Sequence, residues 1–484
     1  MTIAGKTIHG VRVTLTATAL AAVLQAGIIA VLARLIAPAE YGVVIAALVV
    51  LRPVTDVLGA GIEKSVVLPA DMPDPSIAAR YQTAFVGGVL LTLLLAALAF
   101  AAAPLAGDIA AALALLAPVT ILTAVSAVAR GLLRRRLRFA RLAAIDVAGL
   151  MANGALAVAT AIGGWGFHAL VAGQWAHSLV QLALGLWLCG HRPSLGIVPA
   201  ARVLSPIGEG LSKSSVLELL SGQLPQALIG GVLGTAPLGW FNRVYVLVFL
   251  PVELIVNAVT RVALTGFSQS RDDGARLRRG GMALIETTGA AVLPICAGMA
   301  LAGPELVAVA LGPQWAEAAV LAPWLCVAGA ATVLAHTLAM VAEAALRLET
   351  RVRIQAAALL LRGAMLAAAL PFGLTAAVAA VAASALVSML LHLGLVLSAL
   401  GLPAGRALAL LVPGLTAGAA CLAWVALVHA TLAGGAQAPN LEPAWLLAAD
   451  IAGCGAVTLA VYRVLFPNLL DKLLGYTGFI SKRA

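Results

Sequence analysis

Five basic residues occur inside long apolar blocks of this chain, where a charge is costly unless it meets water, a partner or a ligand. They are Arg52, Arg362, Arg261, Arg243 and Lys213. A guanidinium offers a planar fork of donors and keeps its charge, which suits a phosphate group. The set therefore predicts a cationic cavity that holds an anionic group such as a pyrophosphate.

A purely structural role is the alternative for each of these charges. Arg52 stands one helical turn before Asp56, so the two side chains can form a neutralised pair. Long side chains near the end of an apolar block can instead reach water, and the residues so placed are Arg243, Arg261 and Glu218. We favour the cavity for Arg52 and Arg362, and for the other cations both interpretations stay open.

Acidic and neutral polar residues complete the candidate lining of the cavity. They are Asp56, Glu218, Glu253, Gln174, His177 and Gln181. Gln174, His177 and Gln181 recur at helical spacing together with Ser178, so they form one polar stripe. The stripe either lines a wet, sugar-binding cavity or bonds neighbouring helices to one another. Pro53 and Pro251 interrupt two of the blocks and predict bends that act as hinges or as static kinks.

Several chemistries have no support in the sequence. The chain lacks a G-x-x-x-x-G-K-[ST] phosphate loop, which argues against ATP hydrolysis of that kind. His177 has no second histidine or carboxylate at ligand spacing, so we expect no metal site there. Three further histidines, His336, His392 and His429, have no companion carboxylate nearby in the sequence. We therefore expect a transporter rather than an enzyme, with no catalytic residue and no cofactor.

The apolar blocks themselves define the fold class. Apolar residues make up 62% of the chain and charged residues 10%, against about a quarter charged in a water-soluble domain. Blocks of about 20 residues can each cross a bilayer as a helix. The sequence predicts an all-α membrane protein with about fourteen spans, near 11–36, 42–66, 82–106, 109–132, 142–163, 166–190, 209–233, 238–264, 282–303, 315–345, 354–372, 374–400, 406–431 and 444–466.

The connections between the spans alternate in charge. Most Lys and Arg residues fall at one end of each span, and this end is cytoplasmic by the positive-inside rule. We expect a multi-pass protein of the bacterial inner membrane with both termini in the cytoplasm. The net charge of +10 then reflects topology and anionic lipid headgroups, not nucleic acid. The basic segment 134–138 is an anchor at the membrane surface in this interpretation, and the five cysteines are small packing residues.

Two landmarks indicate an internal duplication. Pro53 and Pro251 follow similar segments and stand 198 residues apart, and the similar tripeptides 116–118 and 321–323 are 205 residues apart. The chain would divide into an N-lobe at 1–200, a C-lobe at 201–402 and two additional spans with a tail at 403–484. Six spans in each lobe give both lobes the same orientation, so a pseudo-two-fold axis lies along the membrane normal. That arrangement suits a cavity between two rocking lobes.

Several segments resemble one bacterial family. ARLIAPAEYG at 33–42, LLRRRLRF at 132–139, ALVAGQ at 169–174, LGPQWA at 311–316 and TRV at 260–262 are similar to motifs of the oligosaccharide flippases. These lipopolysaccharide and exopolysaccharide biosynthesis proteins belong to the multidrug/oligosaccharidyl-lipid/polysaccharide exporter superfamily. Arg261 matches the arginine of the last motif directly. The chain departs from the family at Pro225 and Gln226, where relatives often carry Asp and Arg.

The resemblance implies translocation of undecaprenyl-pyrophosphate-linked oligosaccharide units by alternating access. Membrane lipids and a polysaccharide polymerase or assembly proteins are the further partners that it implies. Coupling to H⁺, to Na⁺ or to no ion stays open. Other functions within the same superfamily are a lipid II flippase and a multidrug exporter. A membrane-embedded glycan enzyme or a scaffold for glycan assembly is an alternative from another class.

Overall fold

A computed structural model describes residues 3–67, 74–191, 193, 213–268, 274–344, 348–401, 403–433 and 442–470. Every regular element within these ranges is a helix. Thirteen stretches of the described part are long and apolar enough to cross a membrane, and each coincides with a predicted span. The remaining predicted span, 238–264, falls within helix α10 (Thr235–Ser268). The predicted all-α membrane fold is confirmed.

The chain forms two compact units, Met1–Asn242 and Arg243–Ala484. These units differ from the predicted lobes at 1–200 and 201–402, with 403–484 outside them, because the lobes were defined by an internal repeat in the sequence. Compactness does not test a repeat, so these boundaries stay a prediction. The first unit contains α1 (Ile3–Leu35), α2 (Pro38–Val67), α3 (Asp74–Ala102), α4 (Gly107–Leu116), α5 (Val119–Arg135), α6 (Phe139–Ile162), α7 (Phe167–Cys189), α9 (Lys213–Leu233) and the first turns of α10.

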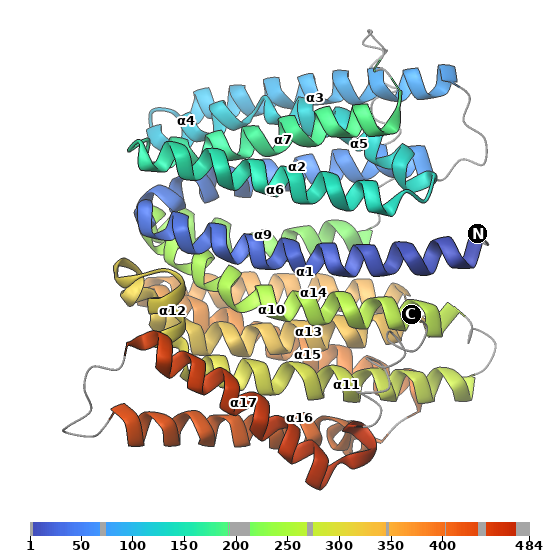
Figure 1. Cartoon of the computed structure of the whole chain (residues 1–484), viewed down its shortest axis with the longest axis vertical. Helices are drawn as coiled ribbons and strands as arrows, with labels where there is room; N and C mark the ends of the chain where they lie inside the picture. The colour runs from blue at the N-terminus through green and yellow to red at the C-terminus, as the bar shows by residue number, and fades with distance from the viewer. Residues whose placement is uncertain are drawn as a thin grey trace. The chain divides into compact units, whose positions relative to one another are not determined.

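Helix α5 lies at the centre of the first unit. It contacts α2, α3 and α7, while α6 runs along α7 on one side and along α1 on the other (Figure 1). The core between these helices consists of Leu, Val, Ile and Ala side chains together with the buried Tyr81. One predicted span, 109–132, is two helices in the structure, because the chain turns between α4 and α5 at Pro118. Proline has no N–H to continue the α4 helix.

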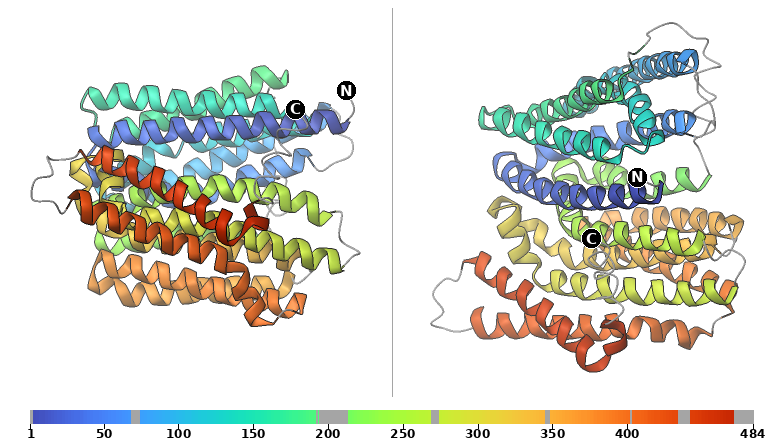
Figure 2. Two further views of the ribbon diagram at one scale, coloured as in Figure 1. Left: turned by 60° about the horizontal axis from the view of Figure 1, so that its bottom comes forward. Right: turned by 45° about the vertical axis from the view of Figure 1, so that its right-hand side comes forward.

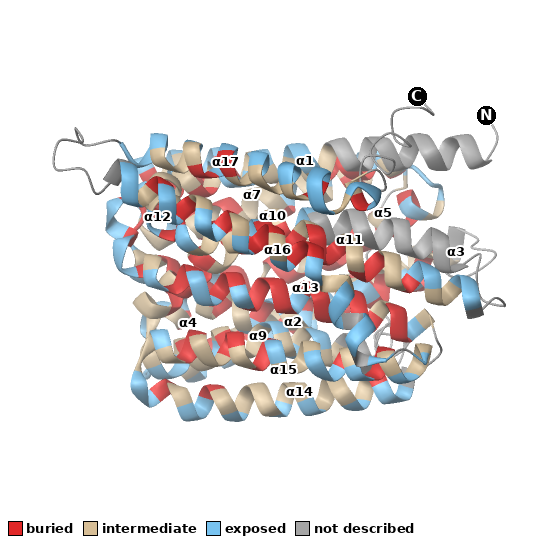
Figure 3. Ribbon diagram, turned by 90° about the horizontal axis from the view of Figure 1, so that it is seen from below, coloured by how far each residue is buried: buried red, intermediate tan, exposed pale blue. Residues whose placement is uncertain are grey.

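The second unit contains the rest of α10, from Arg243, followed by α11 (Gly274–Leu301), α12 (Gly303–Ala310), η1 (Pro313–Leu321), α13 (Ala322–Ala344), α14 (Leu348–Ala369), η2 (Leu370–Phe372), α15 (Leu374–Leu400), α16 (Ala404–Val428), η3 (His429–Ala433) and α17 (Pro443–Leu465). Helix α13 packs against α11 and α15 and is buried along most of its length, whereas α14 is largely exposed or half-buried (Figure 3). Helices α16 and α17 form a hairpin on α11 (Figure 2). The largely exposed surface of α14 is what we expect of a helix that faces lipid.

The landmarks of the predicted duplication occupy equivalent structural places. Pro53 and Pro251 both lie inside long helices, α2 and α10. Pro118 is the N-cap of α5, and Pro323 is the second residue of α13, so each follows a short helical segment. The contacts of α5 with α3 and α7 also recur as contacts of α13 with α11 and α15. Similar helix contacts thus occur in both predicted lobes, while the duplication itself stays a prediction.

A reciprocal glycine contact joins the first turns of α2 and α10 within the first unit. A Cβ added to Gly42 would meet the Thr235 carbonyl, and one added to Gly239 would meet the Pro38 carbonyl. Gly239 stands 197 residues after Gly42, and Thr235 stands 197 residues after Pro38. The contact between the two helix ends is therefore reciprocal.

The basic segment 134–138 holds the ends of two other helices. Arg135 donates to the Val66 carbonyl (3.1 Å) and Arg136 to the Cys189 carbonyl (2.9 Å). These carbonyls belong to the last turns of α2 and α7, which intrahelical bonding leaves without donors. Cationic side chains are also favourable at helix C-termini. The segment therefore has a structural role at helix ends, in keeping with its expected place outside the apolar blocks.

Candidate functional site

A polar cluster in the first unit contains much of the predicted stripe. Arg130 of α5 donates to the Asp146 carboxylate of α6 at 2.5 Å, and the Gln181 amide of α7 lies 3.4 Å from the same oxygen. His177 lies beside Gly149 of α6, within electrostatic range of Asp146. We call Arg130, Asp146, His177 and Gln181 the α5–α7 polar cluster. Its residues are half-buried, so they can meet water or a ligand as well as one another.

Glycines bring the helices of this cluster together. A Cβ on Gly149 would lie 3.0 Å from the Gln181 side chain and 3.1 Å from His177 Nδ1. A Cβ on Gly173 would lie 3.0 Å from the Asn153 carbonyl. Small residues at such positions let two membrane helices approach closely and align their polar side chains. Gln181 thus bonds α7 to α6, and for the rest of the stripe both interpretations stay open.

Arg52 and Asp56 lie on α2 with exposed side chains. They interact electrostatically, and Arg52 is also within electrostatic range of His177. Among the described residues no oxygen of an acidic side chain lies within 4.0 Å of the Arg52 guanidinium. The tight neutralised pair is therefore not formed, and Arg52 can offer its donors to another group. Thr55 bonds back to the Leu51 carbonyl, next to the interruption that Pro53 makes in the helix.

A second polar cluster surrounds Arg362 in the other unit. Its Nε donates to Ser384 Oγ of α15 at 3.2 Å, and Ser384 in turn donates to the Val381 carbonyl at 2.8 Å. Tyr245 of α10 is within electrostatic range of both Arg362 and Glu253. We call Arg362, Ser384, Tyr245 and Glu253 the α10–α15 polar cluster. The bond to Ser384 helps to position the guanidinium near the middle of α14.

The other predicted residues occupy less informative places. Arg243 and Gln174 are half-buried, and Glu218 is exposed. The prolines Pro53 and Pro251 are half-buried inside their helices. The side chains of Lys213 and Arg261 lie outside the described residues, as do the charged tails that bear on the predicted topology. Gln226 accepts a hydrogen bond from Asn242 (3.3 Å) in the position where relatives of the resembled family carry charge.

The sequence analysis did not identify the partners of these residues. Asp146 was not singled out because it stands near the end of its span, and its partner Arg130 belongs to a different helix. One expectation was wrong: His429 does have companion carboxylates. Asp450 lies 3.1 Å and Glu305 4.0 Å from His429 Nε2. These three residues come from α12, η3 and α17, so only tertiary packing unites them and no sequence spacing could have signalled it.

The fold, with its many apolar helices and its polar clusters inside them, defines a multi-pass helical membrane protein. The structure is similar to the lipid II flippase MurJ in an inward closed conformation, with a TM-score of 0.73 over 94% of this chain and 99% of that one, at 12% identity. It is also similar to a multidrug resistance MATE family transporter in an inward-facing conformation, with a TM-score of 0.59 over 82% and 95% of the two chains, at 14% identity. At such identities the likeness establishes the fold.

The chain belongs to the polysaccharide biosynthesis protein family, whose model matches residues 31–320. The family resemblance of the motifs is thereby confirmed. A relative is the succinoglycan biosynthesis transport protein ExoT of Rhizobium meliloti, 27% identical over 296 residues. That match spans 60% of this chain and 59% of the relative.

Proposed function

We propose that this protein is a flippase that translocates undecaprenyl-pyrophosphate-linked oligosaccharide units across the bacterial inner membrane. The family match over residues 31–320 is the observation that carries the proposal. Such a lipid does not cross unaided, because its sugars and pyrophosphate would lose their hydration in hydrocarbon. A fold shared with a lipid II flippase and with a MATE transporter suits this task, and the units would serve exopolysaccharide or lipopolysaccharide synthesis.

Arg52 and Arg362 are the residues that we assign to the pyrophosphate. Each lies inside a long apolar helix, and the Arg52 guanidinium has no acidic side chain within 4.0 Å among the described residues. A planar guanidinium can bind a phosphate through two parallel hydrogen bonds. Arg261, Arg243 and Lys213 would add positive charge, while Gln174, His177 and Gln181 would meet sugar hydroxyls. Asp56, Glu218 and Glu253 would balance the charge of the lining.

We further propose alternating access, in which substrate shifts the balance between inward- and outward-open states. Pro53 and Pro251 interrupt α2 and α10 and would serve as hinges. Transport would need no cofactor, and coupling to H⁺, to Na⁺ or to no ion stays open. Both termini would lie in the cytoplasm, and a polymerase would consume the units on the far side.

Translocation in proteoliposomes tests the proposal directly. Purified protein would be reconstituted with fluorescent undecaprenyl-pyrophosphate oligosaccharide, and label newly accessible to a membrane-impermeant quencher would be followed in time. We expect rates well above those of vesicles that lack the protein. Rates equal to those of empty vesicles, with protein correctly inserted, would contradict the proposal.

Arginine variants test the assigned site. We expect Arg52→Ala and Arg362→Ala to lower translocation at least about tenfold, because each removes a charge-assisted contact worth about 1.5–3 kcal/mol. Arg353→Ala is a matched control on α14, since that side chain is 81% exposed and 4.0 Å from Glu349 in a surface pair. Normal rates for both Arg52→Ala and Arg362→Ala, at normal protein level, would show that these residues are structural.

A lipid II flippase is the second candidate, favoured by the structural match over 99% of the MurJ chain. The same vesicles supplied with fluorescent lipid II would distinguish the two substrates. A multidrug exporter is the less favoured alternative, because a cationic lining repels cationic drugs. Complementation of a mutant that lacks exopolysaccharide, with no rescue of a lipid II flippase mutant, would favour the first proposal.

A further inference from the structure

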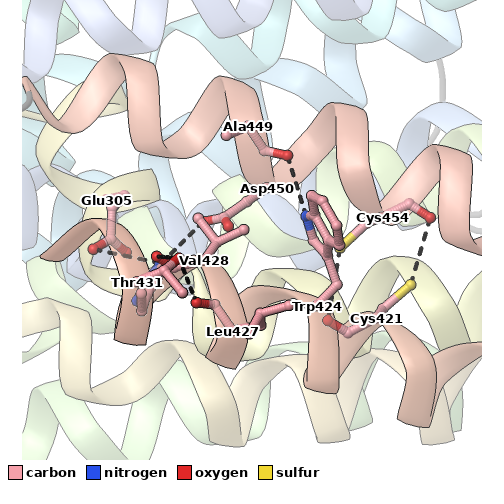
Figure 4. A network of polar contacts seen from close by, with 10 residues as sticks. Glu305, Cys421, Trp424, Leu427, Val428, Thr431, Ala449, Asp450 and Cys454 are labelled. Atoms are coloured by element: carbon pink, nitrogen blue, oxygen red, sulfur yellow. Dashed lines mark hydrogen bonds and ion pairs between the residues drawn. The ribbon is translucent and has the colours of Figure 1, made fainter. Parts of the chain in front are cut away.

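The hairpin of α16 and α17 holds a group of metal-ligating side chains that the flippase proposal does not use. Glu305 of α12, His429 of η3 and Asp450 of α17 each offer one ligand atom, and the three atoms lie within 4.8 Å of one another. Figure 4 shows Glu305 and Asp450 directed toward the same point from two different helices. No other group of this kind is present in the part of the chain that the structure describes.

The Asp450 carboxylate is the strongest indication that a cation belongs there. Its side chain is only 2% exposed, and its Oδ2 lies 3.1 Å from His429 Nε2. Its second oxygen, Oδ1, is buried and has no hydrogen-bond partner among the described residues. Glu305 repeats the pattern, since its buried Oε2 also lacks a partner there. Buried carboxylate oxygens without partners are costly.

The charges of the group also favour a bound cation. Among the described residues His429 is the only basic side chain within 4.0 Å of either carboxylate. Two carboxylates carry a charge of −2, and a protonated imidazole would offset only half of it. A divalent cation bound by neutral imidazole would balance both carboxylates. Buried ionised groups require such compensation.

The geometry fits a transition-metal ion. Bonds of about 2.0–2.1 Å place the ligand atoms of a tetrahedral Zn²⁺ site about 3.3 Å apart. The distances from His429 Nε2 to Asp450 Oδ2 and Glu305 Oε1 are 3.1 and 4.0 Å, and all three ligand atoms lie within 4.8 Å of one another. Ion binding would draw the Glu305 side chain inward. One imidazole with two carboxylates suits Zn²⁺ better than Ca²⁺ or Mg²⁺, which prefer oxygen ligands.

The backbone at His429 is also unusual. The last turns of the hairpin's first helix form the π-helix His429–Ala433. A π-bulge shifts the side chains that follow it around the helix and occurs often at functional sites. Here it begins at the residue that faces both carboxylates. We propose that Glu305, His429 and Asp450 bind one divalent transition-metal ion, which would link α12, the end of α16 and α17. This inference does not depend on the flippase proposal.

Zn²⁺ titration of the purified full chain tests the site. The protein would carry no polyhistidine tag, would be stripped with a chelator, and would be dialysed against Zn²⁺ before metal analysis and calorimetry. We expect one Zn²⁺ per chain and a rise in Tm that the chelator reverses. Asp450→Asn and His429→Gln should each weaken binding at least about tenfold. Co²⁺ should give the visible absorption of a tetrahedral site in the wild type only.

Two controls make the result specific. Glu442→Gln changes an exposed carboxylate at the N-cap position of α17, which makes no capping hydrogen bond, and it should bind Zn²⁺ as the wild type does. Cys421→Ser removes a thiol of the same hairpin and should also leave binding intact. Absence of saturable Zn²⁺ binding, or binding lost with Cys421→Ser and kept with Asp450→Asn, would overturn the proposal. If Asp450→Asn does not fold, Glu305→Gln replaces it as the ligand variant, provided that its gel-filtration profile is normal, and it should weaken Zn²⁺ binding in the same way.

Discussion

Replacing Gly42 by alanine tests the close approach of α2 and α10. A Cβ at this position would lie 2.8 Å from Thr235 Cα and nearer still to the Thr235 carbonyl. Two carbon atoms are at their optimal separation at about 3.5–4.0 Å. Because the atoms in the way belong to the backbone, no side-chain rotation relieves the clash. The two helix ends must therefore separate by about 1 Å.

The size of the effect follows from packing energetics. Adding a methyl group to a well-packed position typically costs about 1–3 kcal/mol, and Gly42 is buried. The higher helix propensity of alanine offsets up to about 1 kcal/mol of this loss in stability. We expect a net loss of about 1–2 kcal/mol, which lowers the Tm of a unit of this size by roughly 2–8 °C. Gly239→Ala should behave alike, because the contact is reciprocal.

Thermal unfolding of the purified chain in detergent, followed by tryptophan fluorescence, measures the loss. Gly59→Ala is the matched control in the same helix, since nothing lies within 4 Å of a Cβ there. The double variant Gly42→Ala, Gly239→Ala should lose less than the sum of the single losses, because one separation relieves both clashes. Equal Tm values for Gly42→Ala and Gly59→Ala would refute the close contact, and full additivity would refute its reciprocal character.

Three further stability predictions use the same melting assay. Asp146→Asn should lower the free energy of unfolding by about 1–2 kcal/mol, because it removes the charged partner of Arg130 in a pair whose side chains are 47% (Asp146) and 22% (Arg130) exposed. An unchanged Tm would mean that solvent already screens the pair. Tyr462→Phe should cost about 1 kcal/mol, because the Ala290 carbonyl loses its donor, and a gain in stability would contradict this bond. Gly455→Ala has open space around its Cβ and should raise the Tm slightly, whereas a marked fall would reveal an unrecognised neighbour.

The spans could be predicted from sequence because the bilayer imposes a length and a composition on each of them. Local breaks were harder to predict. The span at 109–132 contains the turn before Pro118, and the span at 315–345 begins with the 3-10 helix η1. Hydropathy remains high through both breaks, since the residues on each side are apolar. A proline in an apolar run can lie within a bent helix, as Pro53 does, or begin a new one, and tertiary contacts decide between these outcomes.

The candidate site could be predicted only one residue at a time. A lone charge in an apolar block, such as Arg362, stands out because burying it is costly. Its bonding partner Ser384 does not stand out, since serine is common in membrane helices and the pair spans two helices. Asp146 and Asp450 were missed for a related reason. Each stands among small apolar residues, and its partner is brought close by packing rather than by sequence spacing.

The α16–α17 hairpin is held to the rest of its unit by contacts of two different kinds. Near the middle of α16, a Cβ on Gly414 would lie 2.7 Å from the Gly289 carbonyl carbon, so α16 and α11 touch backbone to backbone. Near the end of α17, Tyr462 bonds to α11. The polar group with Asp450 lies at the opposite end, where the hairpin reverses. Loss of a ligand there would free one end while the glycine contact keeps the other docked. Metal binding can therefore be removed by Asp450→Asn without undocking the hairpin, which is why stoichiometry and Tm together separate a ligand from a packing residue.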